Sequence, residues 1–146
     1  MSDEMLLSDI EEIGRSMSVR SYLATTDGEG HPHVVPVHPG WEGSTIWVMT
    51  TETAKKARNI ASNPNIAMHW ESGDAGDGLL VWGRASIHDD AETKHRLWHG
   101  VFDYDLSAFA PNGPDSPEIV FLAVTPTKAA YAKAYGAGGV QRWQAG

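Results

Sequence analysis

The sequence predicts a mainly β protein, a closed or nearly closed antiparallel barrel of six to seven short strands with peripheral helices. Short β-rich runs recur along the chain, and turn signals separate most of them. The links between the first three runs are too short for parallel crossovers, which favours antiparallel pairing. We expect one domain, with an N-terminal helix in 1–18, the barrel in 20–133 and a C-terminal tail in 134–146.

Composition limits the classes of protein that the chain can form. Its 146 residues are 41% hydrophobic and 21% charged, which is typical of a globular protein with a buried core. No apolar run approaches the roughly 18 residues that a membrane span requires, so we expect no membrane partner. The net charge of −8 disfavours non-specific binding to nucleic acid, because phosphates repel an acidic surface.

Cysteine content and the N-terminal residues indicate a compartment. The chain has no cysteine, which excludes disulfides, thiolate catalysis and cysteine-based metal sites. Residues 1–4 are acidic, whereas a secretory signal begins with basic residues. We therefore expect a cytoplasmic protein.

The N-terminal segment predicts an amphipathic helix that packs as a lid on the barrel. Apolar residues recur at spacings of four, three and four and so share one helical face: Leu6, Ile10, Ile13 and Met17. Ser8 and Glu11 match the capping-box pattern at the start of a helix.

The next segment predicts an antiparallel meander. Strands are expected over 21–26, 33–38 and 45–50. The turn residues Asp-Gly-Glu-Gly at 27–30 join the first two, and glycine-rich turn signals within 39–43 lead into the third.

The rest of the chain predicts shorter elements around the same barrel. In order they are a helix over 51–62, strands over 65–70 and 79–87, a helix from Asp89 or Asp90 to about Trp98, a loop over 103–117, and strands over 119–124 and 128–133. Side chains alternate along a strand, so five residues of the strand over 79–87 are expected to share one face: Leu79, Val81, Gly83, Ala85 and Ile87.

Two adjacent lysines mark the segment with the most chemical content. Lys55 and Lys56 fall in or near the first turn of the helix over 51–62, where the helix dipole disfavours cations. One interpretation is a bound phosphate, held by these ammonium groups, by free backbone N–H groups and by the hydroxyls of Thr50, Thr51 and Thr53. The other is a pair of solvated surface lysines beside threonines that cap the helix. The residue types alone leave both open.

A family resemblance favours the first interpretation. The segments SYLATTDGEGHPHVVPV, STIWVMT, TAKKARNIASNPNIAMHW and LLVWGRASI occur in this order. They resemble the pyridoxamine 5'-phosphate oxidase-like flavoproteins, including the general stress protein 26-like branch. The resemblance covers about residues 20 to 90, and the IVFLAV run over 119–124 is similar more weakly. It implies an FMN-binding split barrel that acts as a homodimer, with the cofactor at the dimer interface.

The resemblance also implies which residues hold the cofactor. The phosphate ligands would come from the strand end and the helix start: Met49, Thr50, Thr51, Lys55 and Lys56. The flavin ring would lie along the second strand, with main-chain groups at its polar edge: His33, Val34, Val35, Pro36 and Val37. Three weaker candidates could reach the flavin of the partner subunit: Trp70, Arg142 and Trp143.

Departures from the family pattern shape the expected activity. The oxidase proper grips the phosphate of vitamin B6 with an arginine-rich strand and a C-terminus bearing arginine and histidine. Here these segments are HVVPV and RWQAG, so we do not expect vitamin B6 oxidation. We expect an FMN-dependent oxidoreductase that acts on another small organic substrate. Related barrels use a deazaflavin coenzyme, so a deazaflavin-dependent reductase is one alternative, and a non-catalytic flavin-binding stress protein is another.

No catalytic residue is assigned from the sequence. A flavin supplies its own hydride chemistry, so the protein needs no dedicated acid–base pair. Metal binding is a rival hypothesis, because His31 and His33 share a strand face and His95 and His99 lie four residues apart on a helix. We favour edge-strand and surface positions for these histidines, since no third ligand has a convincing spacing, and we expect no metal.

Overall fold

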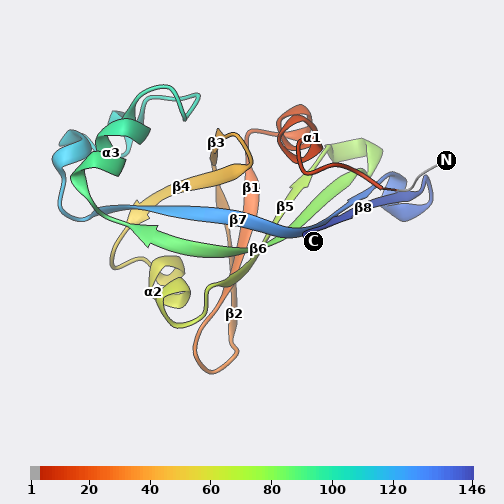
Figure 1. The fold of residues 1–146 in the computed structure, drawn as a ribbon, viewed down its shortest axis with the longest axis horizontal. Coiled ribbons are helices and arrows are strands. Elements are labelled where there is room, and N and C mark those ends of the chain that lie inside the picture. Colours follow the sequence, from red (N-terminus) through yellow and green to blue (C-terminus); the bar gives the residue numbers. More distant parts are fainter. Residues whose placement is uncertain (1–3) are drawn as a thin grey trace.

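The computed structural model describes residues 4–146, and residues 1–3 of the acidic segment lie outside the described part. The chain forms a mostly antiparallel sheet that curls into a half-barrel with three α-helices around it (Figure 1). The elements in chain order are α1 (Asp9–Met17), β1 (Ser21–Thr26), β2 (Pro32–Val37), β3 (Gly40–Glu42), β4 (Thr45–Thr51), α2 (Lys55–Ser62), β5 (Asn65–Glu71), β6 (Gly78–His88), α3 (Ala91–Trp98), β7 (Ile119–Ala132) and β8 (Val140–Gln144). Short 3-10 turns lie at η1 (Gly73–Ala75), η2 (Leu106–Ala108), η3 (Gly113–Asp115) and η4 (Ala134–Gly136).

The order of strands confirms the antiparallel class and corrects the predicted meander. The order is β2-β1-β5-β6-β7-β4-β3, with β8 paired to β7. β1 and β2 pair as expected, but β4 lies between β3 and β7 and does not pair with β2. The short strand β3, which the sequence did not predict, begins just after β2. β4 is buried on both faces, with Ile46 and Val48 on one and Trp47 on the other, and this double burial fits a central position.

β7 is one long strand where the sequence predicted two. It pairs with β6 from Phe121 to Ala132, with β4 over its first half and with β8 over its second half. Pro126 lies at a register shift opposite Trp82 and Gly83, which leaves Thr127 without an opposite residue. A proline is tolerated at such a bulge, so the strand continues through it. The predicted tail contains β8, so the sheet has eight strands rather than six or seven.

The main core fills the inside of the half-barrel, and α1 covers one end of it. Ile10 of α1 is buried there, as the helical spacing predicts. Gly14 lets the helix approach closely, because a Cβ at this position would lie 2.9 Å from the ring of Trp41. Leu6 is instead 66% exposed, since it precedes the helix. The predicted capping box is wrong: Ser8 makes no side-chain cap, and Asp9 accepts the N–H of Leu6 at 2.7 Å.

A second apolar cluster lies on the other face of β4 and β7. α3 and the loop that follows it cover Trp47 and Phe121 there, at the left of Figure 1. Asp90 caps α3 by accepting the N–H of Thr93 at 2.9 Å, as the sequence predicts. On β6, Ile87 keeps its predicted face, opposite Leu122, but is 39% exposed, because this end of the strand runs past the main core. Within residues 4–146, no helix combines the length and apolar character needed to cross a bilayer.

Candidate functional site

The candidate site lies beside two open strand edges of the half-barrel, those of β2 and β4. β2 is the last strand on its side of the sheet, so alternate N–H and C=O groups of 32–37 have no strand partner. β3 pairs only with 45–47 of β4, so the same edge of β4 is open over 48–51. These edges can offer main-chain hydrogen bonds to a planar polar ligand.

Helix α2 is fastened beside these edges. The buried amide of Asn59 donates to the hydroxyl of Thr25 on β1 at 3.0 Å. The ammonium group of Lys55 lies 4.0 Å from the carboxylate of Asp27, in the turn between β1 and β2. Two contacts therefore hold α2 beside the turn end of the β1–β2 hairpin, which extends downward in Figure 1.

The N-terminus of α2 has no cap of its own. The helix begins at Lys55 rather than at the predicted residue 51, because the N–H of Ala54 bonds to the carbonyl of Thr51 in a preceding turn. Ala54 has no side-chain acceptor, and the first turn contains no acidic residue. The first helical hydrogen bond is donated by Arg58, so the three N–H groups before it have no helical acceptor. Both lysines lie in this first turn, as the sequence predicts.

Lys56 adds a cation that the protein does not neutralise. Its side chain is half-buried, and no carboxylate in the described residues lies within ion-pair distance of it. Burial lowers the pKa of its ammonium group, because a charge is less stable where water is excluded. Unpaired N–H groups and a partly desolvated ammonium together form a site that an anion would stabilise.

Asp27 organises the turn beside Lys55. Its carboxylate accepts the backbone N–H groups of Glu29 at 2.8 Å and His31 at 2.9 Å, and it lies 3.0 Å from Nδ1 of His31. The hydrogen bond from the N–H of His31 is the main cause that lowers the pKa of Asp27 from 3.8 to about 2. The carboxylate is therefore ionised at neutral pH and holds Lys55 near the hairpin.

This lowered pKa predicts an acid-dependent loosening of the hairpin. A folded-state pKa below the unfolded value stabilises the protein fully above pH 3.8, and the contribution is lost as pH falls toward about 2. The protection factor of the His31 amide against hydrogen exchange should therefore fall over that interval in the wild type. In Asp27→Asn the protection factor should be low throughout, whereas Asp74→Asn, on the distant turn η1, should behave like the wild type. Equal protection in Asp27→Asn would contradict this account.

β2 presents two different faces at the site. His33, Val35 and Val37 lie opposite Thr25, Leu23 and Ser21 of β1, whose side chains are buried inside the half-barrel. Nδ1 of His33 is buried and has no hydrogen-bond partner in the described residues. Val34 and Pro36 face the other way and are exposed. An unpaired buried nitrogen is costly, so His33 is suited to a hydrogen bond with a ligand.

The exposed face of β2 is part of a larger surface, which we call the outer face. Residues directly opposite one another in antiparallel strands share a face of the sheet. Two such rows cross six strands: Val34, Ala24, Ala67, Trp82, Lys128 and Gln144, and Pro36, Tyr22, His69, Leu80, Ala130 and Arg142. Neither row contains an acidic residue. Arg142 thus shares the outer face with β2 but lies at the opposite end of it.

Other predicted site residues lie elsewhere. Met49 packs its side chain into the second apolar cluster, so only its main chain reaches the open edge of β4. Trp70 is 1% exposed and lies against Trp41 in the main core, with ring centroids 5.4 Å apart. Trp143 packs against that core from the face opposite Arg142. In a single chain the structure brings Lys55 close to the turn that precedes β2, with Lys56 next to it in α2, and it does not bring these tryptophans there.

Three site residues escaped the sequence interpretation: Thr25, Asp27 and Asn59. Asn59 lies in α2 between Ala57 and Ile60, which are both buried, and a polar residue on an apolar helical face is the signal that could have found it. Two of the histidines considered as metal ligands are instead hydrogen-bonded to aspartates. His31 bonds Asp27, and His95 bonds Asp115 at 2.7 Å. Within the described residues, no three metal-ligating side chains converge.

Comparison with known proteins identifies the class that this fold defines. The half-barrel is the fold of a protein related to general stress protein 26, of the pyridoxinephosphate oxidase family, from Clostridium acetobutylicum; the TM-score is 0.76 and the identity 20%, over 94% of this chain and 93% of that one. The sequence profile of the family described as Pyridoxamine 5'-phosphate oxidase matches residues 16–133. The chain belongs to this family.

Individual relatives agree with that assignment. General stress protein 26 of Bacillus subtilis (strain 168) is 31% identical over 107 residues, which cover 71% of this chain and 72% of the relative. A pyridoxamine 5'-phosphate oxidase-related, FMN-binding protein from Nostoc punctiforme PCC 73102 has a TM-score of 0.68 at 18% identity, over 94% and 86% of the two chains. A structure described as an F420 reductase has a TM-score of 0.60 at 25% identity, over 81% and 94%.

Proposed function

We propose that this protein is a cytoplasmic, homodimeric FMN-binding oxidoreductase that acts on a small organic substrate. One observation carries the proposal: the uncapped start of α2, with Lys55 and the half-buried Lys56, lies at the open edges of the half-barrel. In a cofactor that joins a phosphate monoester to a planar ring system, the phosphate matches the start of α2 and the ring matches the open strand edges. The family and the FMN-binding structural neighbour support the same conclusion.

The residues present fit such a cofactor. The first-turn N–H groups of α2 and the ammonium groups of Lys55 and Lys56 would hold the phosphate, with the hydroxyls of Thr50 and Thr51 beside them. The open edge of β2 would meet the polar edge of the ring, and the unpaired Nδ1 of His33 would gain a partner. When bound, a flavin supplies the hydride transfer itself. The protein's own contribution is to bind and orient the cofactor and to exclude water.

Two alternatives are supported by particular relatives. The F420 reductase neighbour favours a deazaflavin coenzyme, whose anionic tail would use the same cations. The relatedness to general stress protein 26 favours a flavin-binding stress protein without turnover. Vitamin B6 oxidation is not proposed, because β2 carries no arginine and the C-terminal residues lack the Arg/His pair of the oxidase.

Dimerisation would complete the site. The outer face carries exposed apolar side chains, including Tyr22 and Val34, and no acidic residue in its two central rows. Because Arg142 and Val34 lie at opposite ends of this face, a two-fold axis through it would place Arg142 of one protomer near β2 of the other. This is the reach toward the partner's flavin that the sequence predicts for Arg142.

The dimer proposal predicts a selective effect at β2. Val34→Arg should convert the dimer to a monomer, because the new cation would be buried near Arg142 of the partner subunit, with no acidic residue in the two rows to pair with it. Val34 is 64% exposed within one chain, so the substitution should not unfold the protomer. Leu6→Arg is the matched control, since Leu6 is 66% exposed but lies outside the outer face. Light scattering that shows a wild-type monomer, or an intact Val34→Arg dimer, would contradict the proposal.

The cofactor proposal is tested on the purified protein. Absorbance and fluorescence titration with FMN, and in parallel with a deazaflavin coenzyme, should show saturable binding of FMN at one site per chain. Reduction of the bound flavin by NADH or NADPH, followed by its reoxidation by added quinones, would distinguish an enzyme from a storage protein. Absence of saturable FMN binding, with tight deazaflavin binding, would move the chain to the first alternative.

A further inference from the structure

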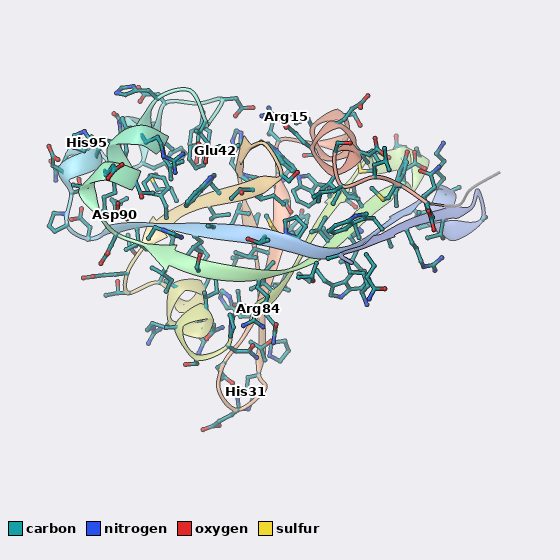
Figure 2. All side chains as sticks on the ribbon, viewed as in Figure 1. Arg15, His31, Glu42, Arg84, Asp90 and His95 are labelled. Carbon is teal, nitrogen blue, oxygen red and sulfur yellow. The ribbon has the colours of Figure 1, made fainter. Side chains whose placement is uncertain are left out.

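A small cavity with several hydrogen-bond donors lies apart from α2. It occupies about 100 Å³ between the C-terminal end of α1, the link from β2 to β3, and the loop after α3. Arg15 and Ser18 line it from the α1 side, His38 from the link, Trp41 from β3, and Asp103 from the loop. Figure 2 shows Arg15 on the side of α1 that faces β3.

Arg15 and Ser18 retain unused donors at this cavity. Nε of Arg15 donates to Glu11 at 2.9 Å, and its guanidinium carbon lies 6.0 Å from the ring of Trp41. A guanidinium has five N–H donors, so four remain for another acceptor. Oγ of Ser18 accepts the N–H of Arg20 at 3.0 Å, and its own proton is free to donate.

His38 is held in a fixed orientation. Its Nε2 lies 2.5 Å from the carboxylate of Asp103, and its ring lies against that of Tyr104 at 4.2 Å between centroids. The hydroxyl of Tyr104 also donates to the carbonyl of His38 at 3.4 Å. Within the described residues, Nδ1 of His38 has no hydrogen-bond partner. The carboxylate that lines the cavity is thus already engaged by the imidazole.

We infer that this cavity binds the carboxylate group of a small organic acid. The planar fork of Arg15 matches a carboxylate in two parallel hydrogen bonds, and the hydroxyl of Ser18 can add a third. Val19 and Trp41 provide an apolar wall for a short carbon chain. A water molecule occupies about 30 Å³ in the liquid, so the cavity holds roughly three or four groups of that size, about as many as acetate has non-hydrogen atoms.

Three negative features oppose the binding of an anion at this cavity: Asp103, Glu11 and the net charge of the chain. The carboxylate of Asp103 is already paired with His38. Glu11 competes for Arg15, but both side chains are substantially exposed, and an exposed ion pair of this kind contributes little. The net charge of −8 repels anions over the surface as a whole, so binding requires the donors to act together. The site involves no residue of α2 and does not depend on the proposed flavin.

NMR titration of the full chain tests this inference. Acetate should cause saturable shifts in the indole signal of Trp41 and the imidazole signals of His38. Acetamide, which has the same shape without the charge, should bind at least tenfold more weakly. Arg15→Gln should abolish the acetate response, and Arg20→Gln, which alters an arginine that does not line the cavity, should retain it.

The controls make each result decisive. Arg15 is exposed, so Arg15→Gln should leave the NMR signals of residues away from the cavity unchanged. If those signals change, Ser18→Ala provides a second variant. We expect Ser18→Ala to bind acetate more weakly than the wild type does. The inference is overturned if acetate gives no saturable shift, if acetamide gives the same response, or if the folded variant at Arg15 or Ser18 responds like the wild type.

Discussion

Replacing Lys55 and Lys56 together with alanine is expected to weaken FMN binding about a hundredfold. A hydrogen bond to a charged group contributes about 1.5–3 kcal/mol, so the loss of two at the phosphate removes about 3 kcal/mol or more. Lys56 contributes the larger share, because among residues 4–146 no carboxylate lies within ion-pair distance of its half-buried ammonium group to compete with the phosphate. Flavin fluorescence titration of the wild type and the double variant measures the difference.

The fold should survive this change. Lys55 is exposed apart from its 4.0 Å contact with Asp27, and alanine favours a helix more than lysine does. The melting temperature should therefore change little. Lys133→Ala removes an exposed lysine on the hairpin from β7 to β8 and should leave FMN affinity unchanged. Undiminished FMN affinity in the Lys55/Lys56 variant would remove the phosphate site from α2.

Phe121→Ala is expected to lower the free energy of unfolding by about 3–5 kcal/mol, the usual cost of removing a buried aromatic ring. Phe121 is 0% exposed and packs against Trp98 and Phe102, with ring centroids 6.4 Å and 5.8 Å away. These rings attach α3 and its loop to the sheet beside β4. The loss should appear in urea denaturation, and the weaker cover over β4 should also reduce FMN affinity.

Phe109 provides the matched control for this prediction. It lies on the loop after α3 and is 72% exposed, so Phe109→Ala should change the free energy of unfolding by no more than about 0.5 kcal/mol. If Phe121→Ala lowered the free energy of unfolding no more than Phe109→Ala does, the second apolar cluster would not stabilise the fold, and the prediction would be wrong.

Local patterns predicted most of the strands, because alternation of side chains is a property of a few neighbouring residues. β1 begins and ends at the predicted residues, and β4 differs by one. β3 was missed because its three residues lie between turn signals, where no alternation can develop. Pro126 divided β7 in the prediction, since the sequence does not show that a bulge accommodates it. Which strands pair, such as β4 with β7, depends on contacts between segments that are distant in the sequence, so local patterns do not predict it.

The candidate site was predictable only where it is continuous in sequence. The lysines lie in the first turn of α2 because a helical turn is local. The contacts from Asn59 to Thr25 and from Lys55 to Asp27 join residues far apart in the chain, and no spacing rule reveals them. Trp70 was a candidate through the family resemblance, yet a period of two does not say which face of β5 is the inside.

The triple pairing of β7 has a consequence for biosynthesis. During synthesis, β4 and β6 leave the ribosome before the strand that lies between them, so neither can take its final place in the sheet until β7 has emerged. β4 leads directly into α2, and the open edge of β4 at the candidate site is fixed only when β4 pairs with β7. A nascent chain should therefore capture its cofactor only late in translation, and until then the exposed apolar faces of β4 and β6 would be natural substrates for chaperones.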